Sequence, residues 1–214
     1  FSCHLDPMKP TPQRLIQEHY RSLLAKHGDS AEAAQYSSRE SQERRFRQLI
    51  RIGDLRGMRI LDFGCGSGHL ATYLQADGID VCYTGVDIVP ELLDVGRAKH
   101  PSHRFGQLAD FAHERFDYVL VSGVYNNRRG DNRRFWQQSA RELFALCDRG
   151  LAFNMMSKYV DYEDTGLFYE QPEKAFAFVK KELTPYANLI HDYLVKDGSI
   201  PFEFCIQALR VPTP

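Results

Sequence analysis

The sequence of 214 residues predicts an α/β fold: a doubly wound, mostly parallel sheet with helices on both faces and a final antiparallel hairpin. Three observations predict this class. Short apolar runs alternate with helical segments from residue 58 onward, and a glycine-rich turn joins the first run to a helix. The last two runs, 186–195 and 202–210, are separated by a short polar stretch, which is hairpin spacing.

The elements follow in order from the spacing of apolar residues. Helical spacing over 11–27 and again over 39–52 predicts two N-terminal helices, and Gly28 ends the first as a C-cap. The strands expected in the parallel part of the sheet are 58–63, 80–86, 103–107, 116–122 and 149–156. The helices expected between and after them are 67–76, 90–99, 131–146 and 172–181.

This pattern predicts one domain over 11–214, with N-terminal helices over 11–55 and the core over 56–214. Residues 1–10 show no periodicity, so we interpret them as a disordered or vector-derived leader.

Composition narrows the possible partners. A net charge of −1 gives no cationic excess of the kind that nucleic-acid binders carry. No apolar run approaches the roughly 18 residues needed to span a membrane. The cysteines and histidines form no metal-binding spacing. We therefore expect a cytoplasmic protein with a small-molecule partner and no nucleic-acid, membrane or metal site.

The stretch ILDFGCGSG, residues 60–68, is the first candidate site. Gly64, Gly66 and Gly68 follow a strand and precede a helix, which places backbone N–H groups at the carboxyl edge of the sheet. A dinucleotide fingerprint would need a third glycine at position 69, which is His69. The spacing argues against a pyrophosphate ligand, and a plain tight turn is the alternative.

Acidic residues end the next two strands. Asp87 follows the run 80–86, where a carboxylate can accept both hydroxyls of a ribose, or can cap the helix that begins near Pro90. Asp110 follows the third strand, where it can meet an adenine amino group beside Phe111 or be a surface acid. The glycine turn and the two acids thus end consecutive strands.

Together these features resemble the class I S-adenosylmethionine-dependent methyltransferase family over residues 36–210. ILDFGCGSG is closely similar to the first motif of that family, and VDI, LADF and FDYVLVSGV are similar to later ones. The resemblance implies a Rossmann-like sheet of seven strands with a reversed final strand, S-adenosyl-L-methionine as cofactor, and methyl transfer as activity. The stretch QYSSRESQERRFRQLIRIGDL is similar to the lead-in helix of a subgroup that modifies small molecules.

The resemblance also implies a set of cofactor-binding residues. Asp62 would orient the amino group, Asp87 would hold the ribose hydroxyls, and Ile88 would pack on the adenine. Arg45 would reach the cofactor carboxylate, or would lie on a solvated cationic helix face. The full set is Arg45, Asp62, Gly64, Cys65, Gly66, Asp87, Ile88, Asp110, Phe111 and Ser122, the last at the sulfonium end.

Methyl transfer is an in-line displacement, so aligning the reactants and excluding water can supply about 7 to 11 kcal/mol. A base is needed only where the nucleophile must lose a proton. His191 is the first candidate for that catalytic role and Tyr125 the second; a buried structural histidine is the alternative for His191.

Aromatic and cationic residues follow the fourth and fifth strands. We expect some of these side chains to line or cover the acceptor pocket: Tyr125, Asn126, Trp136, Asn154, Tyr159, Tyr162, Phe168 and Tyr169. The arginines at 128, 129, 133 and 134 would bind an acidic group of the substrate, or would form a solvated face.

The sequence therefore favours methyl transfer to a small polar metabolite, such as a sugar, amino-acid or acid derivative. If the arginines after the fourth strand bind the substrate, the substrate is anionic. Two alternatives stay open. The substrate can be carrier-tethered or macromolecular, or the protein can bind the cofactor without catalysis.

Overall fold

The computed structural model describes residues 11–212, so the leader predicted over 1–10 lies outside the described residues. The strands are β1 (Arg59–Phe63), β2 (Cys82–Val86), β3 (Arg104–Gly106), β4 (Phe116–Val121), β5 (Cys147–Ser157), β6 (Tyr169–Glu170), β7 (Tyr186–Ile190) and β8 (Glu203–Leu209). The α-helices are α1 (Pro12–His27), α2 (Arg39–Ile50), α3 (His69–Ala76), α4 (Pro90–Lys99), α5 (Asn132–Leu146) and α6 (Pro172–Glu182). Two 3-10 turns are η1 (Glu32–Ala34) and η2 (Leu108–Phe111).

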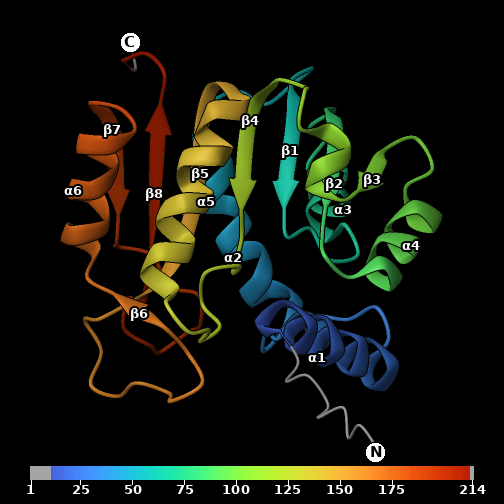
Figure 1. The fold of residues 1–214 in the computed structure, drawn as a ribbon, viewed down its shortest axis with the longest axis horizontal. Coiled ribbons are helices and arrows are strands. Elements are labelled where there is room, and N and C mark those ends of the chain that lie inside the picture. Colours follow the sequence, from blue (N-terminus) through green and yellow to red (C-terminus); the bar gives the residue numbers. More distant parts are fainter. Residues whose placement is uncertain (1–10, 213–214) are drawn as a thin grey trace, which may run out of the picture.

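The strands form one twisted sheet in the order β3-β2-β1-β4-β5-β8-β7, and β6 pairs with β5 outside this path (Figure 1). The strands from β3 to β5 run parallel to one another, whereas β8 is antiparallel to both β5 and β7. The predicted class, a mostly parallel seven-strand path with a reversed final strand and N-terminal helices, is confirmed. The two-residue strand β6 was not predicted.

The sheet is covered on both faces, as its central strands require. Ile60 of β1 belongs to the core cluster that includes side chains of α2 and α3, whereas the next residue, Leu61, belongs to the cluster that includes side chains of α5 and α6. Successive side chains of a strand point to opposite faces, so a strand buried on both faces is apolar at every such position. The two core clusters hold the strand ends, and hence the loops that follow them, in fixed places.

The strand β7 is shorter than the run 186–195 predicts. It ends at Ile190, and the chain then leaves the sheet so that Tyr193 and Val195 pack into the core cluster with α2 and α3. The burial of Tyr193 and Val195 in this cluster accounts for the apolar pattern beyond Ile190. The spacing of apolar residues in this segment therefore predicts which side chains are buried, but it does not predict where strand pairing ends.

The helix α1 lies across the carboxyl end of the sheet, beyond the arrowheads of β1 and β4 (Figure 1). It ends at Gly28, whose φ of 63° and N–H bond to the Leu24 carbonyl confirm the predicted C-cap. Gln17 donates to the carbonyl oxygen of Ile88 at 2.6 Å, and Arg21 pairs with Glu91 of α4. These contacts attach α1 to the segment that follows β2. No helix within 11–212 has the length and apolar character to cross a membrane.

Candidate active site

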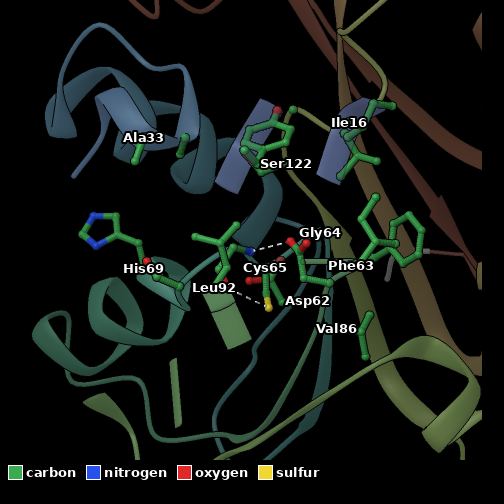
Figure 2. Close-up of a pocket in the computed structure, with 18 of the residues that line it drawn as sticks. Ile16, Ala33, Asp62, Phe63, Gly64, Cys65, His69, Val86, Leu92 and Ser122 are labelled. Carbon is green, nitrogen blue, oxygen red and sulfur yellow. Dashed lines mark hydrogen bonds between the residues drawn. The ribbon is translucent and has the colours of Figure 1, made fainter. Parts of the chain in front are cut away.

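A cavity of about 830 Å³ lies between α1 and the carboxyl ends of the parallel strands. Its walls come from α1, η1, α2 and the loops after β1, β2, β3 and β4. Figure 2 shows Ile16 and Ala33, from the N-terminal segment, on one side of this space and Asp62, Gly64 and Cys65 on another. The N-terminal segment and the loops at the carboxyl ends of the strands thus surround one cavity.

The glycine turn after β1 forms the floor of the cavity. Gly64 and Gly66 both have positive φ, 76° and 55°, which L side chains rarely adopt. A Cβ on Gly64 would collide with the side chain of Val124, whereas a Cβ on Gly66 would enter open space. The N–H groups of Gly64 and Cys65 both donate to the Val86 carbonyl, at 2.8 and 3.1 Å. The turn is therefore held against β2 with its backbone at Gly66 accessible to a ligand.

Asp87 lies directly across from this turn. One oxygen accepts from Gly66 N and the other from Val89 N, each at 2.9 Å. The residue at the N-cap of α4 is Val89, so the structure does not support Asp87 as the helix cap. Burial raises the pKa of Asp87, although the backbone N–H groups of Val89, Gly66 and Ile88 act in the opposite direction. The carboxylate lines the cavity and can accept hydroxyl groups there.

Asp62, at the end of β1, lines the same space while only 3% of its surface is exposed. The hydroxyl of Tyr83 donates to it at 2.6 Å. Burial, the largest cause, and the nearby charge of Asp87 together raise the pKa of Asp62 to about 7, against the lowering effect of the Tyr83 bond. A cationic group that enters the cavity would favour the ionised form of Asp62.

Three further residues of the predicted cofactor set also line the cavity: Cys65, Ile88 and Ser122. The Ser122 hydroxyl lies 3.3 Å from that of Tyr36. Burial keeps the pKa of the Cys65 thiol well above its ordinary value, so this thiol stays neutral and is not a nucleophile. The cavity therefore brings together the predicted residues Asp62, Gly64, Cys65, Gly66, Asp87, Ile88 and Ser122.

A family model described as a methyltransferase domain matches residues 36–161. The chain belongs to the class I S-adenosylmethionine-dependent methyltransferase family. This confirms the resemblance, the enzyme class and S-adenosylmethionine as the cofactor. The open backbone at Gly66 and the cavity-facing carboxylate of Asp87 fit an adenosyl ligand.

The chain is similar to several other methyltransferases. It is 30% identical over 142 residues to Rv1506c of Mycobacterium tuberculosis, whose name describes a methyltransferase, covering 63% of this chain and 86% of that protein. It is 39% identical over 75 residues to magnesium-protoporphyrin O-methyltransferase of Rhodobacter capsulatus, which covers 32% of this chain and 33% of that protein. The structure of magnesium protoporphyrin IX methyltransferase from Synechocystis, with bound S-adenosylmethionine, covers 96% of this chain and all of that one at 14% identity and a TM-score of 0.67.

Arg45 is not among the residues that line the cavity of the methyltransferase, so the structure gives no support to its expected contact with the cofactor carboxylate, which stays a prediction. Its guanidinium is buried and donates to Glu203 of β8. The structure also contradicts the alternative of a solvated face. Neighbouring Gln42 and Arg39 line the cavity in its place, so helix α2 contributes to the site through a different face.

The loop after β3 lines the cavity, but the two side chains predicted there, Asp110 and Phe111, do not. Asp110 is exposed and accepts from Gln107 N at 2.8 Å, which caps η2. The ring of Phe111 is covered by the Arg104 guanidinium, 5.1 Å from the ring centre. Neither residue lines the cavity, whereas residues 107–109 do. The adenine contacts predicted for Asp110 and Phe111 stay predictions.

The two candidate bases also lie outside the residues that line the cavity. Tyr125 is 1% exposed, and its hydroxyl lies 3.0 Å from that of Ser139 on α5. His191 follows β7, where its Nε2 lies 3.1 Å from the Pro201 carbonyl oxygen. Both side chains thus contact other parts of the protein, and their roles as bases stay predictions. The eight residues expected to line or cover the acceptor pocket, Tyr125 included, are likewise absent from the lining of this cavity.

The cavity is covered by α1, to which the sequence analysis assigned no role in the site. Ile16, Tyr20 and Leu24 recur at helical spacing and all face the cavity. Their apolar stripe was visible in the sequence, but the sequence pattern does not say which surface such a stripe contacts. Tyr36, between α1 and α2, was also missed, because an isolated tyrosine in a loop carries no periodic signal.

Proposed function

We propose that this methyltransferase transfers the methyl group of S-adenosylmethionine to a small polar metabolite, such as a sugar, amino-acid or acid derivative. The observation that carries the proposal is the cavity beneath α1, about 830 Å³ in volume. Small-molecule pockets have volumes of about 300 to 1,000 Å³. A macromolecular acceptor would have to displace α1, which Gln17 and Arg21 attach to the loop and helix after β2.

In this proposal the residues of the chain bind and orient, and they exclude water. When bound, the cofactor supplies a sulfonium methyl group and a neutral leaving group. Asp87 holds the ribose hydroxyls, the backbone at Gly66 lies against the cofactor, and Asp62 receives its amino group. The side chains of α1 close the space against water, so that alignment of the acceptor with the methyl group supplies most of the rate enhancement.

Binding and transfer are tested in two steps. Calorimetry with S-adenosylhomocysteine should show binding to the wild-type protein, and Asp87→Asn should weaken that binding by about tenfold or more, equivalent to about 1.4 kcal/mol. Asp94→Asn is the matched control, because Asp94 lies on the exposed face of α4 and pairs with Arg97. Equal affinity in the Asp87 and Asp94 variants would remove Asp87 from the cofactor site.

Transfer is then followed with radiolabelled S-adenosylmethionine and a cell extract divided by dialysis into diffusible and retained fractions. The proposal expects label in the diffusible fraction. Label only in the retained fraction would establish a carrier-tethered or macromolecular acceptor. Tight cofactor binding with no transfer in either fraction would favour the non-catalytic alternative.

A further inference from the structure

The four arginines that follow β4 have different surroundings. Arg133 donates two hydrogen bonds to the buried carboxylate of Glu170, at 2.7 and 2.8 Å. Arg128 is exposed and donates to a loop carbonyl at 3.1 Å. Arg134 is exposed at the start of α5. Only Arg129, of these four, lines the cavity.

The guanidinium of Arg129 has few partners in the protein. Its Nη2 makes one long hydrogen bond of 3.4 Å to the Val124 carbonyl, and its centre lies 4.4 Å above the ring of Phe135. Its buried Nε has no hydrogen-bond partner. Within residues 11–212 no carboxylate forms a salt bridge with it, although the charge of Asp87 acts on it from a longer distance. A buried donor without a partner costs about 1–3 kcal/mol, and more when it is charged. An anionic ligand would remove that cost.

The surroundings of Arg129 favour an acid with an apolar body. Ile16 of α1 and Val124 after β4 line the same cavity as Phe135. Tyr20 also lines it, and burial raises the pKa of Tyr20 to about 12, so its hydroxyl stays protonated. That hydroxyl accepts from Asn127 at 2.8 Å, and its own proton is a second donor near Arg129.

The cofactor carboxylate has a different cationic neighbour available. Arg39, at the start of α2, also lines the cavity, and it donates to Gln42 Oε1 and to the Asp29 carbonyl beside η1. The two arginines therefore line the cavity from separate elements, α2 and the loop before α5, and the Asp29 carboxylate lies 3.9 Å from the Arg39 guanidinium. The cofactor has one carboxylate, which leaves one of these cations for another anion.

We infer that Arg129 binds an acidic group, a carboxylate or phosphate, on the methyl acceptor, and that Tyr20 donates to the same group. This inference rests on the proposed function, because it assigns the substrate class of that same cavity. Arg129 is then a specificity-determining residue: it favours an organic acid over an uncharged molecule of the same shape. The acid anchors the acceptor while its apolar body lies against Phe135 and Val124.

A matched pair of probes tests this assignment: 1-naphthoate and its uncharged amide, 1-naphthamide. Each is titrated by calorimetry into the protein, with and without saturating S-adenosylhomocysteine. The wild type should bind the acid more tightly. Arg129→Gln should weaken binding of naphthoate by about tenfold or more and leave that of naphthamide unchanged. Arg134→Gln, an exposed arginine of the same segment, should behave as the wild type, and Arg129→Lys should keep part of the preference.

The other outcomes overturn the inference. Equal binding of the two probes to the wild type, or no binding of naphthoate, would show that no acid is recognised here. A loss of S-adenosylhomocysteine affinity in Arg129→Gln with the naphthoate preference intact would assign Arg129 to the cofactor carboxylate. Failure of the wild type to bind S-adenosylhomocysteine would instead contradict the proposed function, and the probe titrations without it would still decide the role of Arg129.

Discussion

Arg45 and Glu203 form a buried ion pair between α2 and β8, with the two side chains 9% and 1% exposed. Further hydrogen bonds lead from Glu203 toward the cavity. Asn154 of β5 donates to Glu203 at 2.7 Å and accepts from the N–H of Gly123 at 2.8 Å. Gly123 follows β4 and lines the cavity, so a continuous chain of hydrogen bonds connects the buried pair to the site.

Removal of one member of this pair should be costly. Arg45→Met leaves Glu203 buried without a counter-charge, so we expect the free energy of unfolding to fall by about 3–5 kcal/mol, measured by urea denaturation. The double variant Arg45→Met, Glu203→Met should be more stable than Arg45→Met alone. Arg44→Met is the control: its partners Glu40 and Asp197 are exposed, so the loss should be far smaller than at Arg45. Equal losses at 44 and 45 would refute the role of the buried pair.

Asp62 should make stability depend on pH. Its folded-state pKa of about 7 lies above the value of about 3.9 expected in the unfolded chain. The native state therefore retains a proton that the unfolded state loses, so this contribution to stability is complete at low pH and is lost as pH rises through 7. Between about pH 5 and 7 the wild type should lose about 2 kcal/mol that Asp62→Asn does not lose. Parallel stability curves for the two proteins over this range would contradict the assignment.

The attachment of α1 should control how fast the cofactor leaves. Gln17→Ala removes the hydrogen bond to the Ile88 carbonyl, worth about 1 kcal/mol. We expect dissociation of S-adenosylhomocysteine in stopped-flow experiments to become about fivefold faster, with more rapid amide exchange in α1. Arg14→Gln is the control, because Arg14 pairs with Glu18 within the helix. If both variants release the ligand at the wild-type rate, α1 is not a cover that opens.

Substitution of Tyr125 should affect stability and not chemistry. Tyr125→Phe removes the contact with the Ser139 hydroxyl and leaves the ring packed, so the free energy of unfolding should fall by about 1 kcal/mol. Transfer to an acceptor found in the diffusible fraction should continue at the wild-type rate. His191→Gln should leave transfer unchanged as well. A variant of normal stability with a large loss in kcat would restore the substituted residue as a candidate base.

The parts of the site that the sequence predicted are the local ones. A strand, a glycine turn and a helix occupy consecutive residues, so the position of Gly64 and Gly66 follows from the spacing of neighbours. Asp87 follows in the same way from the end of β2. Both predictions depend on parallel strands that end at one edge of a sheet, and the observed topology has that arrangement.

The parts that failed depend on contacts between distant residues. The partner of Arg45 is 158 residues away in the chain, and nothing near Arg45 indicates a buried carboxylate. The apolar stripe of α1 predicted a buried face but not the cavity that it covers. Strand β6 has only two residues, too few for any periodic signal. In each case the sequence gives the chemistry of a side chain and not the identity of its neighbour.

The position of β8 between β5 and β7 also constrains how the chain is made. Among the described residues, β7 pairs only with β8, which lies between β7 and β5. On the ribosome, residues 186–190 emerge before 203–209, so β7 has no strand to join when it first appears. Until β8 inserts, β5 presents an open parallel-sheet edge of the kind that recruits other extended chains. Nascent chains of this enzyme should therefore need protection by chaperones over this interval of translation.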